Sequence, residues 1–321
     1  MCLCIIVAME HSPYEYHILS NARLKDVQSL FQEIFSKRVS MEYLQAKYNT
    51  SWTGVQNICF LAYHSGKPVA FYGATPQIFI HQGKQFLVAQ AGDSMTLPAH
   101  QRKGLHKKLA LLSYARMQTL GIRFVYAFHS ENTYHSCKKL NWKEGPRMRG
   151  FWVKTGTLPW GKVARRLPGL KAWHKRRSAR LLKVHTLNNG AEKWSTIPKQ
   201  VEKMQVDYRS AFFAYKTFTP NAICEFSGAR FWIKCESIIS VGAVQFERLE
   251  QLVSGIEELK RLGKKLGLPQ ILFQTTRGSV INEWLESHYT GFDSWLVGYF
   301  AFEEGIPFTD WQISFGDLDT F

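Results

Sequence analysis

The sequence lacks several patterns that would define its class at once. No apolar run approaches the roughly 18 residues of a membrane-spanning helix. The six cysteines are scattered without a Cys-x-x-Cys pair, which argues against a zinc ribbon and a disulfide framework. Neither G-x-x-x-x-G-K-[ST] nor G-x-G-x-x-G occurs, so the Walker phosphate loop and the dinucleotide fingerprint are excluded. Free thiols are typical of a reducing compartment, and we expect a cytoplasmic protein.

Acidic residues are missing from one long stretch. Between Glu144 and Glu192 lie 47 residues with no Asp or Glu and twelve Lys or Arg, which supply +12 of the net charge of +16. We predict a basic, weakly amphipathic segment over residues 154–196. It is a solvated linker, a patch for an acidic partner, or a membrane-surface helix pair that makes the protein peripheral to the membrane through residues 154–183. Nucleic acid is disfavoured because no aromatic platform accompanies the charge.

The first nine residues are apolar but give a poor secretion signal, because they lack a basic lead-in and are too short. We interpret them either as a buried strand or as an extension upstream of a true start at Met9.

The rest of the chain has the composition of a globular protein. Hydrophobic residues make up 45% and charged residues 21% of 321 residues, a length that suggests about two domains. Apolar spacing and turn residues predict alternating helices and strands. We expect helices over 23–35, 41–48, 132–140, 201–215, 249–266 and 279–288, with another from Gly104, and strands over 14–19, 57–63, 67–71, 77–81, 85–91, 93–97, 123–128, 231–235, 237–243, 270–275 and 295–302.

An element order recurs in the two halves. The sequence helix, strand, helix, strand over residues 104–153 is repeated over residues 249–302, which suggests two related α/β domains. We therefore predict a duplicated α/β fold with a mixed central sheet flanked by helices. The expected division is residues 1–153, the basic segment 154–196, and residues 197–321.

The most informative stretch is Ser94 to Lys108, S-M-T-L-P-A-H-Q-R-K-G-L-H-K-K. A predicted strand ends at Pro98, a short loop follows, and a helix begins after Gly104. The first turn of a helix leaves about four amides unpaired, and the helix dipole adds positive charge, so a phosphate group binds well there. Glycine lets the backbone approach a ligand closely. The alternative is a plain strand-to-helix turn with a solvated basic face.

This stretch resembles the coenzyme A site of GNAT N-acetyltransferases, whose signature [QR]-x-x-G-x-[GA] follows a V-x-P strand end. Gln101, Gly104 and Pro98 are in register with that signature. Farther along, Asn132, a short helix and K-L-N-W occupy the place of the family's Asn, Tyr-containing helix and K-L-G-F. The resemblance covers roughly residues 14–153.

Two departures from the family pattern matter. His106 replaces a small residue and would either crowd the pyrophosphate or contact it. Cys137 aligns with the family's usual acid Tyr. The second domain has no phosphate loop before Leu252 and resembles a GNAT core that has lost its cofactor site.

The resemblance implies an acetyl-CoA-dependent N-acetyltransferase in which a primary amine attacks the thioester directly. It implies acetyl-CoA as cosubstrate, with the pyrophosphate on the loop amides and the pantetheine arm along the strand end. The cofactor-binding residues that it implies are Met95, Thr96, Leu97, Gln101, Arg102, Lys103, Gly104, Leu105, His106, Lys107 and Asn132.

The reaction needs an acid for the leaving thiolate and a base for the ammonium. Cys137 is our positional choice for the acid, with Tyr134 as a rival. The alternative is that Cys137 is a buried thiol that packs against the strand. The base is sought among Asp93, His129 and Glu131. No H-E-x-x-H or carboxylate partner supports a metal site at His129.

The acceptor is expected to be a small-molecule or glycan amine. The closing segment, residues 311–321, resembles tails of tandem GNAT proteins in bacterial envelope-sugar pathways, which suggests an amino sugar. Asp317 and Asp319 would meet its ammonium or belong to a solvated C-terminus. Two alternatives remain: a Fem-type aminoacyl transferase that holds transfer RNA on the basic segment, and a non-catalytic GNAT-like binding protein.

Overall fold

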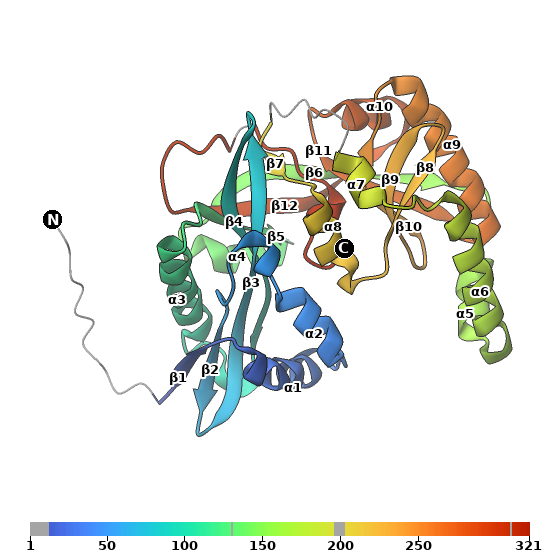
Figure 1. Ribbon diagram of the computed structural model, residues 1–321. Coiled ribbons are helices and arrows are strands. Elements are labelled where there is room, and N and C mark those ends of the chain that lie inside the picture. Colours follow the sequence, from blue (N-terminus) through green and yellow to red (C-terminus); the bar gives the residue numbers. More distant parts are fainter. Residues whose placement is uncertain (1–12, 130, 196–202, 309) are drawn as a thin grey trace. The chain divides into compact units, whose positions relative to one another are not determined.

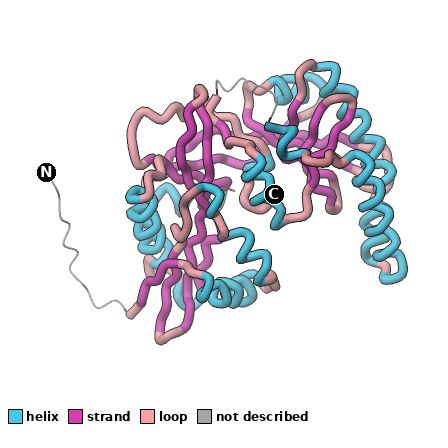
Figure 2. The backbone as a smooth tube through the Cα atoms, in the orientation of Figure 1, coloured by secondary structure: helices cyan, strands magenta, loops and turns pink. Residues whose placement is uncertain are grey.

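The protein is described from a computed structural model, which covers residues 13–129, 131–195, 203–308 and 310–321. The apolar start of the chain and the first residues of the helix predicted from residue 201 lie outside these ranges. The chain divides into two compact units, one of residues up to Pro76 with Ala89–Ile122, the other of Gln77–Val88 with Arg123–Phe321. Both units contain helices and strands (Figures 1 and 2), which confirms the predicted mixed α/β class.

The first unit is a sheet covered by helices. Its strands follow the order β1, β2, β3, β4, and β1–β2 and β2–β3 pair antiparallel. Helices α1 and α2 lie on one face of this sheet and α3 lies on the other (Figure 1). The elements are β1 (Glu15–Ile18), α1 (Leu24–Phe35), α2 (Met41–Tyr48), β2 (Phe60–His64), the first part of β3 (Lys67–His81), the last part of β4 (Lys84–Thr96) and α3 (Leu105–Thr119).

Helix α1 forms because its apolar residues recur at helical spacing. Leu24, Val27, Leu30 and Phe31 are buried against Cys59, Leu61, Phe71 and Met95 of the sheet. The helix ends at Ser36, which has a positive φ of 52° and whose amide donates to Gln32 O. The packing of α1 therefore fixes the strand ends β2 and β4 on which the candidate site is built.

The second unit is a larger sheet with the strand order β5, β12, β6, β11, β10, β9, β8. Its strands are β5 (Phe124–His129), β6 (Lys143–Lys154), β7 (Gln205–Val206), β8 (Ala222–Phe226), β9 (Ala229–Cys235), β10 (Ile239–Gln245), β11 (Gln270–Thr276) and β12 (Gly291–Ala301). Its helices are α4 (Glu131–Lys138), α5 (Trp160–Arg166), α6 (Pro168–His185), α7 (Gly190–Ser195), α8 (Ser210–Tyr215), α9 (Leu249–Leu266) and α10 (Val280–His288).

The repeated element order is confirmed, and the last strands of the two repeats are exchanged. The order α3, β5, α4, β6 recurs as α9, β11, α10, β12. Strand β12 pairs antiparallel with both β5 and β6, and β6 pairs antiparallel with β11. Each repeat therefore completes its sheet with the final strand of the other. The division at residues 153 and 196 stays a prediction.

The strands between residues 67 and 97 are longer than predicted. The separate strands 67–71 and 77–81 form one strand, β3, and 85–91 and 93–97 belong to one strand, β4. Strand β3 is buried without interruption from Val69 to Gln77, although it contains Gly73 and Pro76. Burial on both faces outweighs the local turn preference of these residues.

The helix predicted before β8 is also wrong. Instead of a helix over 201–215, the chain forms β7 and then the short helix α8. Val206 pairs with Phe79 of β3, so a tertiary strand pairing replaces the first part of the expected helix. Strand β8, which pairs with β9, was not predicted from the sequence.

The C-terminal segment is packed into the second unit, which contradicts the expectation of a solvated tail. Asp317 is only 3% exposed, and its carboxylate accepts from the Tyr208 hydroxyl (2.6 Å) and from the Ser314 amide (2.7 Å). A Cβ at Gly316 would lie 2.1 Å from the Trp232 ring, so only glycine fits this close approach. The Asp317 carboxylate is bonded to protein groups of the second unit and does not face solvent, where an acceptor amine would meet it. Within the described ranges, no helix is long and apolar enough to cross a membrane.

Burial of Asp317 predicts a pH-dependent stability. Burial raises the pKa of its carboxyl from 3.8 to about 6, so the folded state holds this proton more tightly than the unfolded state. The stabilisation is complete below about pH 4 and is lost as the pH rises through 6, by about 2 to 3 kcal/mol. Urea unfolding of the wild type and Asp317→Asn at several pH values measures the difference. A difference that stays constant from pH 4 to 7 would show that burial does not shift this group.

Candidate active site

The loop that follows β4 has the geometry of an anion site. A single turn of 3-10 helix, Pro98–His100, leads into Gln101, whose side-chain Nε2 donates to Thr96 O (3.3 Å) and so fastens the loop to the strand end. Arg102 and Gly104 have positive φ values of 61° and 76°. These left-handed residues turn the chain sharply from the strand into α3.

The first amides of α3 are open. The first backbone hydrogen bond of the helix runs from Lys108 N to Gly104 O (3.0 Å). Over the residues that the structure describes, no backbone carbonyl accepts from the amides of residues 104–107. Arg102, Lys103 and Lys107 are exposed around them. Four free donors, the positive end of a helix and three cations together favour a phosphate-bearing ligand.

The corresponding helix of the second repeat, α9, has a side-chain cap before its first turn. The Gln251 side chain of α9 accepts from the amides of Glu247 (2.9 Å) and Arg248 (3.1 Å). Arg248 precedes α9 as Gly104 precedes α3, so the amide that is open at Gly104 is occupied at Arg248. The absence of a phosphate loop from the second repeat stays a prediction.

Glycine is favoured at position 104 by its backbone conformation, and not because neighbouring protein atoms leave no room for a side chain. Its φ of 76° is unfavourable for residues with a Cβ, and a Cβ added there would meet no heavy atom within 4 Å. The space beside Gly104 is therefore open to a ligand.

His106 is held against the protein. Its imidazole packs edge-on against the buried ring of Tyr72, with ring centroids 5.7 Å apart. Burial lowers the pKa of His106, so the ring is neutral near pH 7 and adds no charge to the loop.

At the strand end before the loop, backbone groups that were predicted to bind the cosubstrate are hydrogen-bonded to protein. The Leu97 amide donates to Val69 O (2.9 Å), and the Leu97 carbonyl accepts from the His100 amide (2.9 Å). Met95 is buried in the core beneath α1. Both backbone groups of Leu97 are thus occupied by protein, which counts against the expectation that they hold a pantetheine arm.

Asp93 is one half of a buried ion pair. It has a positive φ of 47° within β4, and its Oδ2 lies 2.5 Å from Lys47 Nζ and accepts from the Tyr48 hydroxyl (2.8 Å). Lys47 is 2% exposed. Neither partner was predicted from the sequence, although a lysine on the sheet-facing side of the predicted helix 41–48 was a signal that it needed a buried acid.

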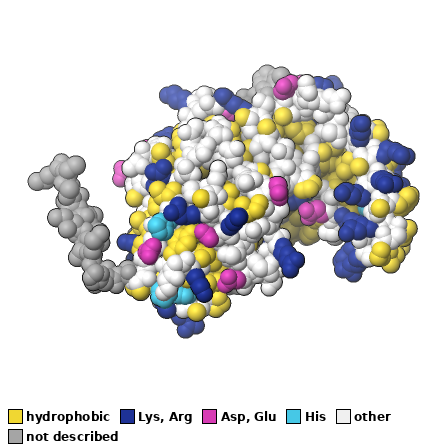
Figure 3. Space-filling view, turned by 60° about the horizontal axis from the view of Figure 1, so that its bottom comes forward, with side chains coloured by type: hydrophobic (Ala, Val, Ile, Leu, Met, Phe, Trp, Pro, Cys, Tyr) yellow, Lys and Arg dark blue, Asp and Glu magenta, His cyan; other side chains and the backbone are white. Residues whose placement is uncertain are grey.

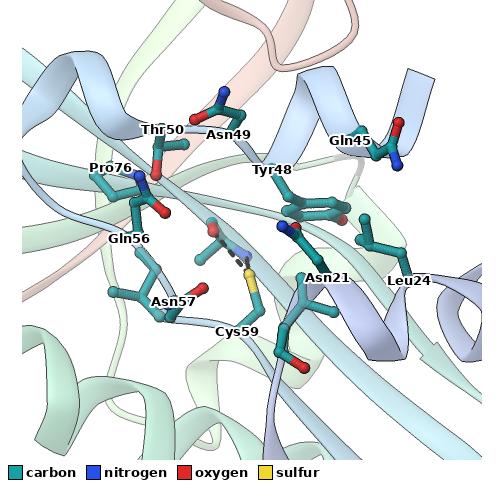
Figure 4. Close-up of a pocket in the computed structure, with 14 residues that line it drawn as sticks. Asn21, Leu24, Gln45, Tyr48, Asn49, Thr50, Gln56, Asn57, Cys59 and Pro76 are labelled. Carbon is teal, nitrogen blue, oxygen red and sulfur yellow. Dashed lines mark hydrogen bonds between the residues drawn. The ribbon is translucent and has the colours of Figure 1, made fainter. Parts of the chain in front are cut away.

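The first unit also contains a neutral polar pocket of about 260 Å³ (Figure 4). Tyr48 lines it and connects it to Asp93 through its hydroxyl. The lining has no charged side chain and is rich in carboxamides, from Asn21, Gln45, Asn49, Gln56 and Asn57. Amide groups both donate and accept, so this lining suits a neutral ligand with many hydroxyl or amide groups.

Cys59 also lines the pocket but is not reactive. Its Sγ donates to Ala74 O (3.0 Å), and burial raises the pKa of the thiol to about 12. A thiol that stays protonated is a poor nucleophile, so Cys59 is a structural donor.

The second unit contributes the predicted acid candidates on α4. Cys137 is buried, and burial raises the pKa of its thiol to about 11. Tyr134 is buried, donates to Trp142 O (3.3 Å), and also has a raised pKa because of burial. Both groups are protonated at neutral pH, as a general acid must be.

The remaining candidates of the second unit are His129, Glu131 and Asn132. Burial lowers the pKa of His129 to about 4, and its Nε2 has no partner among the described residues. Glu131 and Asn132 lie in the first turn of α4, and their side chains are outside the described part of the structure. Among the residues that are described, no three His, Cys, Asp or Glu side chains form a group that would hold a metal ion.

The predicted site residues are divided between the units. Asp93, the strand end and the whole phosphate loop belong to the first unit, whereas Asn132, Tyr134 and Cys137 belong to the second. Within the first unit, the structure adds Lys47 and Tyr48 to the predicted residues.

Residues 15–144 match the family described as acetyltransferase (GNAT) domain, a range that begins at β1 and ends in β6. Over these residues, which are about two fifths of its length, the chain is similar to the GNAT acetyltransferase family. The match includes the open loop between β4 and α3, and a search of curated proteins found no match.

Solved structures share the GNAT fold over most of the chain. A protein from Enterococcus faecalis described as a probable N-acyltransferase matches 90% of this chain and 72% of its own, with a TM-score of 0.60 and 10% identity. A GCN5-related N-acetyltransferase from Kribbella flavida matches the same shares, with a TM-score of 0.57 and 10% identity. The N-myristoyltransferase of Saccharomyces cerevisiae matches 98% of this chain and 88% of its own, with a TM-score of 0.58 and 11% identity.

The Lys47–Asp93 pair predicts a strong asymmetry between single and double substitutions. Lys47→Met leaves the partly exposed Asp93 carboxylate without its cation and should lower the free energy of unfolding by about 1–3 kcal/mol. Adding Asp93→Asn removes the unpaired charge and should recover a large part of that loss. Urea unfolding of the wild type, both single variants and the double variant measures the coupling. Additive losses would mean that the two groups do not interact.

Proposed function

We propose that this protein is a GNAT-type, acyl-CoA-dependent N-acyltransferase, and that it transfers acetyl from acetyl-CoA to a primary amine. The observation that carries the proposal is the set of open amides at residues 104–107, surrounded by three exposed cations, in a matching GNAT domain. A diphosphate needs such donors. The similar yeast enzyme is an N-myristoyltransferase solved with bound myristoyl-CoA, which supports the coenzyme A class.

The proposed cosubstrate contacts follow the loop. The amides of residues 104–107 would hold the diphosphate together with the side chains of Arg102, Lys103 and Lys107. Gly104 leaves room for close approach. Thr96 and Asn132 remain proposed contacts to the rest of the cosubstrate, whereas Met95 is buried and the backbone groups of Leu97 are bonded to protein. Bound acetyl-CoA supplies an acyl thioester, which a neutral amine attacks with formation of a C–N bond and loss of the thiolate.

The chain must move two protons in this reaction. One leaves the amine nitrogen, and we propose Asp93 as its acceptor, positioned by Lys47 and Tyr48. The other goes to the thiolate sulfur, and we propose the Cys137 thiol as its donor with Tyr134 as the rival. The raised pKa values of Cys137 and Tyr134 support the second role because both groups carry a proton at neutral pH.

The neutral pocket is the proposed place for the acceptor's body. Its carboxamides would bind hydroxyl groups, and its Tyr48 wall adjoins Asp93, which would face the amine. These features support an amine-bearing, hydroxyl-rich molecule, such as an amino sugar of an envelope or polysaccharide pathway. They support a Fem-type aminoacyl transferase less, because that reaction does not need the open phosphate cradle.

A pair of substitutions at one residue tests the cosubstrate site. Gly104→Glu and Gly104→Gln have the same size and carry the same cost of a left-handed residue, about 1–2 kcal/mol. Only Glu places a negative charge beside the open amides. We expect the Glu variant to bind acetyl-CoA about 10- to 100-fold more weakly than the Gln variant, measured by calorimetry.

Two results would contradict the proposal. If the wild type does not bind acetyl-CoA or coenzyme A, the transferase assignment fails. If the Glu and Gln variants bind equally well, the loop does not hold the diphosphate. Binding without amine acetylation would favour the non-catalytic alternative.

A second test separates a catalytic thiol from a packing thiol. Cys137→Ala should lower the rate of amine acetylation about tenfold or more while the affinity for acetyl-CoA stays the same. Cys224→Ala is the matched control, because burial raises the pKa of that thiol to about 11 as well and it lies in the core under α9. If both variants keep the wild-type rate, Tyr134→Phe tests the rival acid.

A further inference from the structure

Helices α5 and α6 form a basic hairpin that the proposed reaction does not use. Together they span Trp160–Arg166 and Pro168–His185, and Leu167 between them has an extended backbone. From the sequence alone, this segment remained open as a linker, an acidic-partner patch or a membrane-surface pair. The structure adds which side chains face the protein and which remain exposed.

The hairpin is fixed to the second unit. His174, which is buried, makes a hydrogen bond from Nε2 to Leu266 O (3.2 Å) at the end of α9, and Arg177 donates to Lys265 O. Leu181 and Leu182 pack against the core beneath α9. A Cβ at Gly161 would lie 2.6 Å from Leu266 O, so α5 approaches this end of α9 closely. The hairpin is therefore a docked element and presents a defined outer surface.

That outer surface is strongly apolar. Leu158 is 80% exposed, Val163 is 55% exposed and Trp173 is 53% exposed, and Leu167 and Leu170 are exposed beside them. Leu158, Val163, Leu170 and Trp173 line an open depression of about 850 Å³. In it, the Arg177 guanidinium lies 5.2 Å from the Trp160 ring and 5.7 Å from the Trp173 ring. Exposed patches of this kind mark interaction sites.

Cations border the apolar surface. Side chains coloured as basic and as hydrophobic gather at the right edge of Figure 3, over the place of α5 and α6 in Figure 1. No acidic residue occurs between Glu144 and Glu192. The exposed cations of the hairpin are Lys162, Arg166, Lys171, Lys175, Arg176, Arg180 and Lys183.

We infer that this hairpin docks the protein onto the surface of a membrane that contains anionic lipids. Leucine, valine and tryptophan side chains would enter the boundary between headgroups and acyl chains, and the bordering lysines and arginines would contact lipid phosphates. Nucleic acid and acidic proteins match the charge, but neither explains aliphatic side chains exposed at the centre of the patch. An anionic membrane surface would bind both the apolar side chains and the cations that border them.

Vesicle co-sedimentation with the full chain tests this inference. The wild type should bind vesicles of phosphatidylcholine with phosphatidylglycerol, bind vesicles of phosphatidylcholine alone at least about tenfold more weakly, and lose affinity as salt rises. Brominated lipids should quench its tryptophan fluorescence.

Two variants separate the two halves of the surface. Lys171→Gln/Lys175→Gln/Arg176→Gln should weaken binding at least about tenfold, whereas Arg261→Gln/Lys264→Gln/Lys265→Gln, which removes three cations from α9, should bind like the wild type. Leu158→Ser/Val163→Ser should weaken binding and reduce quenching, whereas Leu111→Ser/Val280→Ser, at exposed apolar positions elsewhere, should not.

Several outcomes would overturn the inference. It fails if the wild type does not bind anionic vesicles at low salt, or if the hairpin and α9 charge variants lose affinity equally, which would indicate net charge alone. It also fails if the apolar variant binds normally, because an acidic macromolecule would then fit the surface better. Acetyl-CoA affinity should be unchanged in every variant, so this result is independent of the proposed transferase activity.

Discussion

Strand β12 lies between β5 and β6, and this pairing constrains both repeats of the chain. A strand without neighbours exposes unpaired amides and carbonyls, which proteins avoid. Because β6 is completed by β11 and β12, the first repeat is not a finished sheet without the second. The second repeat therefore remains necessary although Gln251 occupies the amides at the start of its helix α9. The first repeat has open amides at the start of α3, and the second repeat completes the sheet and holds the C-terminal segment.

Burial sets the charge of the candidate groups more than their position in the sequence does. It keeps the thiols of Cys59 and Cys137 protonated and His129 neutral, whereas Asp93 is paired with a buried lysine. The exposed cations of the loop remain free to attract phosphate. The first unit therefore combines a positive loop with a neutral pocket, an arrangement suited to one anionic and one uncharged, hydroxyl-rich ligand portion.

Charge is also segregated along the chain. The basic segment contributes most of the excess positive charge, and the structure turns it into a docked helical hairpin. Its leucines are used in two ways: Leu181 and Leu182 pack inward beneath α9, whereas Leu167 and Leu170 stay exposed. The membrane inference depends on this distinction between inward and outward residues of one amphipathic segment.

The sequence by itself determined the features that depend on local order. Helical spacing located α1, α2, α3, α9 and α10, the repeated element order was recognisable, and the short loop between β4 and α3 followed from a glycine between a strand and a helix. Only the tertiary structure decided that β6 and β12 each complete the sheet of the other repeat, and that β3 continues as one strand through Pro76. It also decided the pairing of Lys47 with Asp93 and the burial of Asp317. The physical reason is range: periodicity and turn chemistry act over a few residues, whereas strand partners and buried charges are set by residues far apart in the chain.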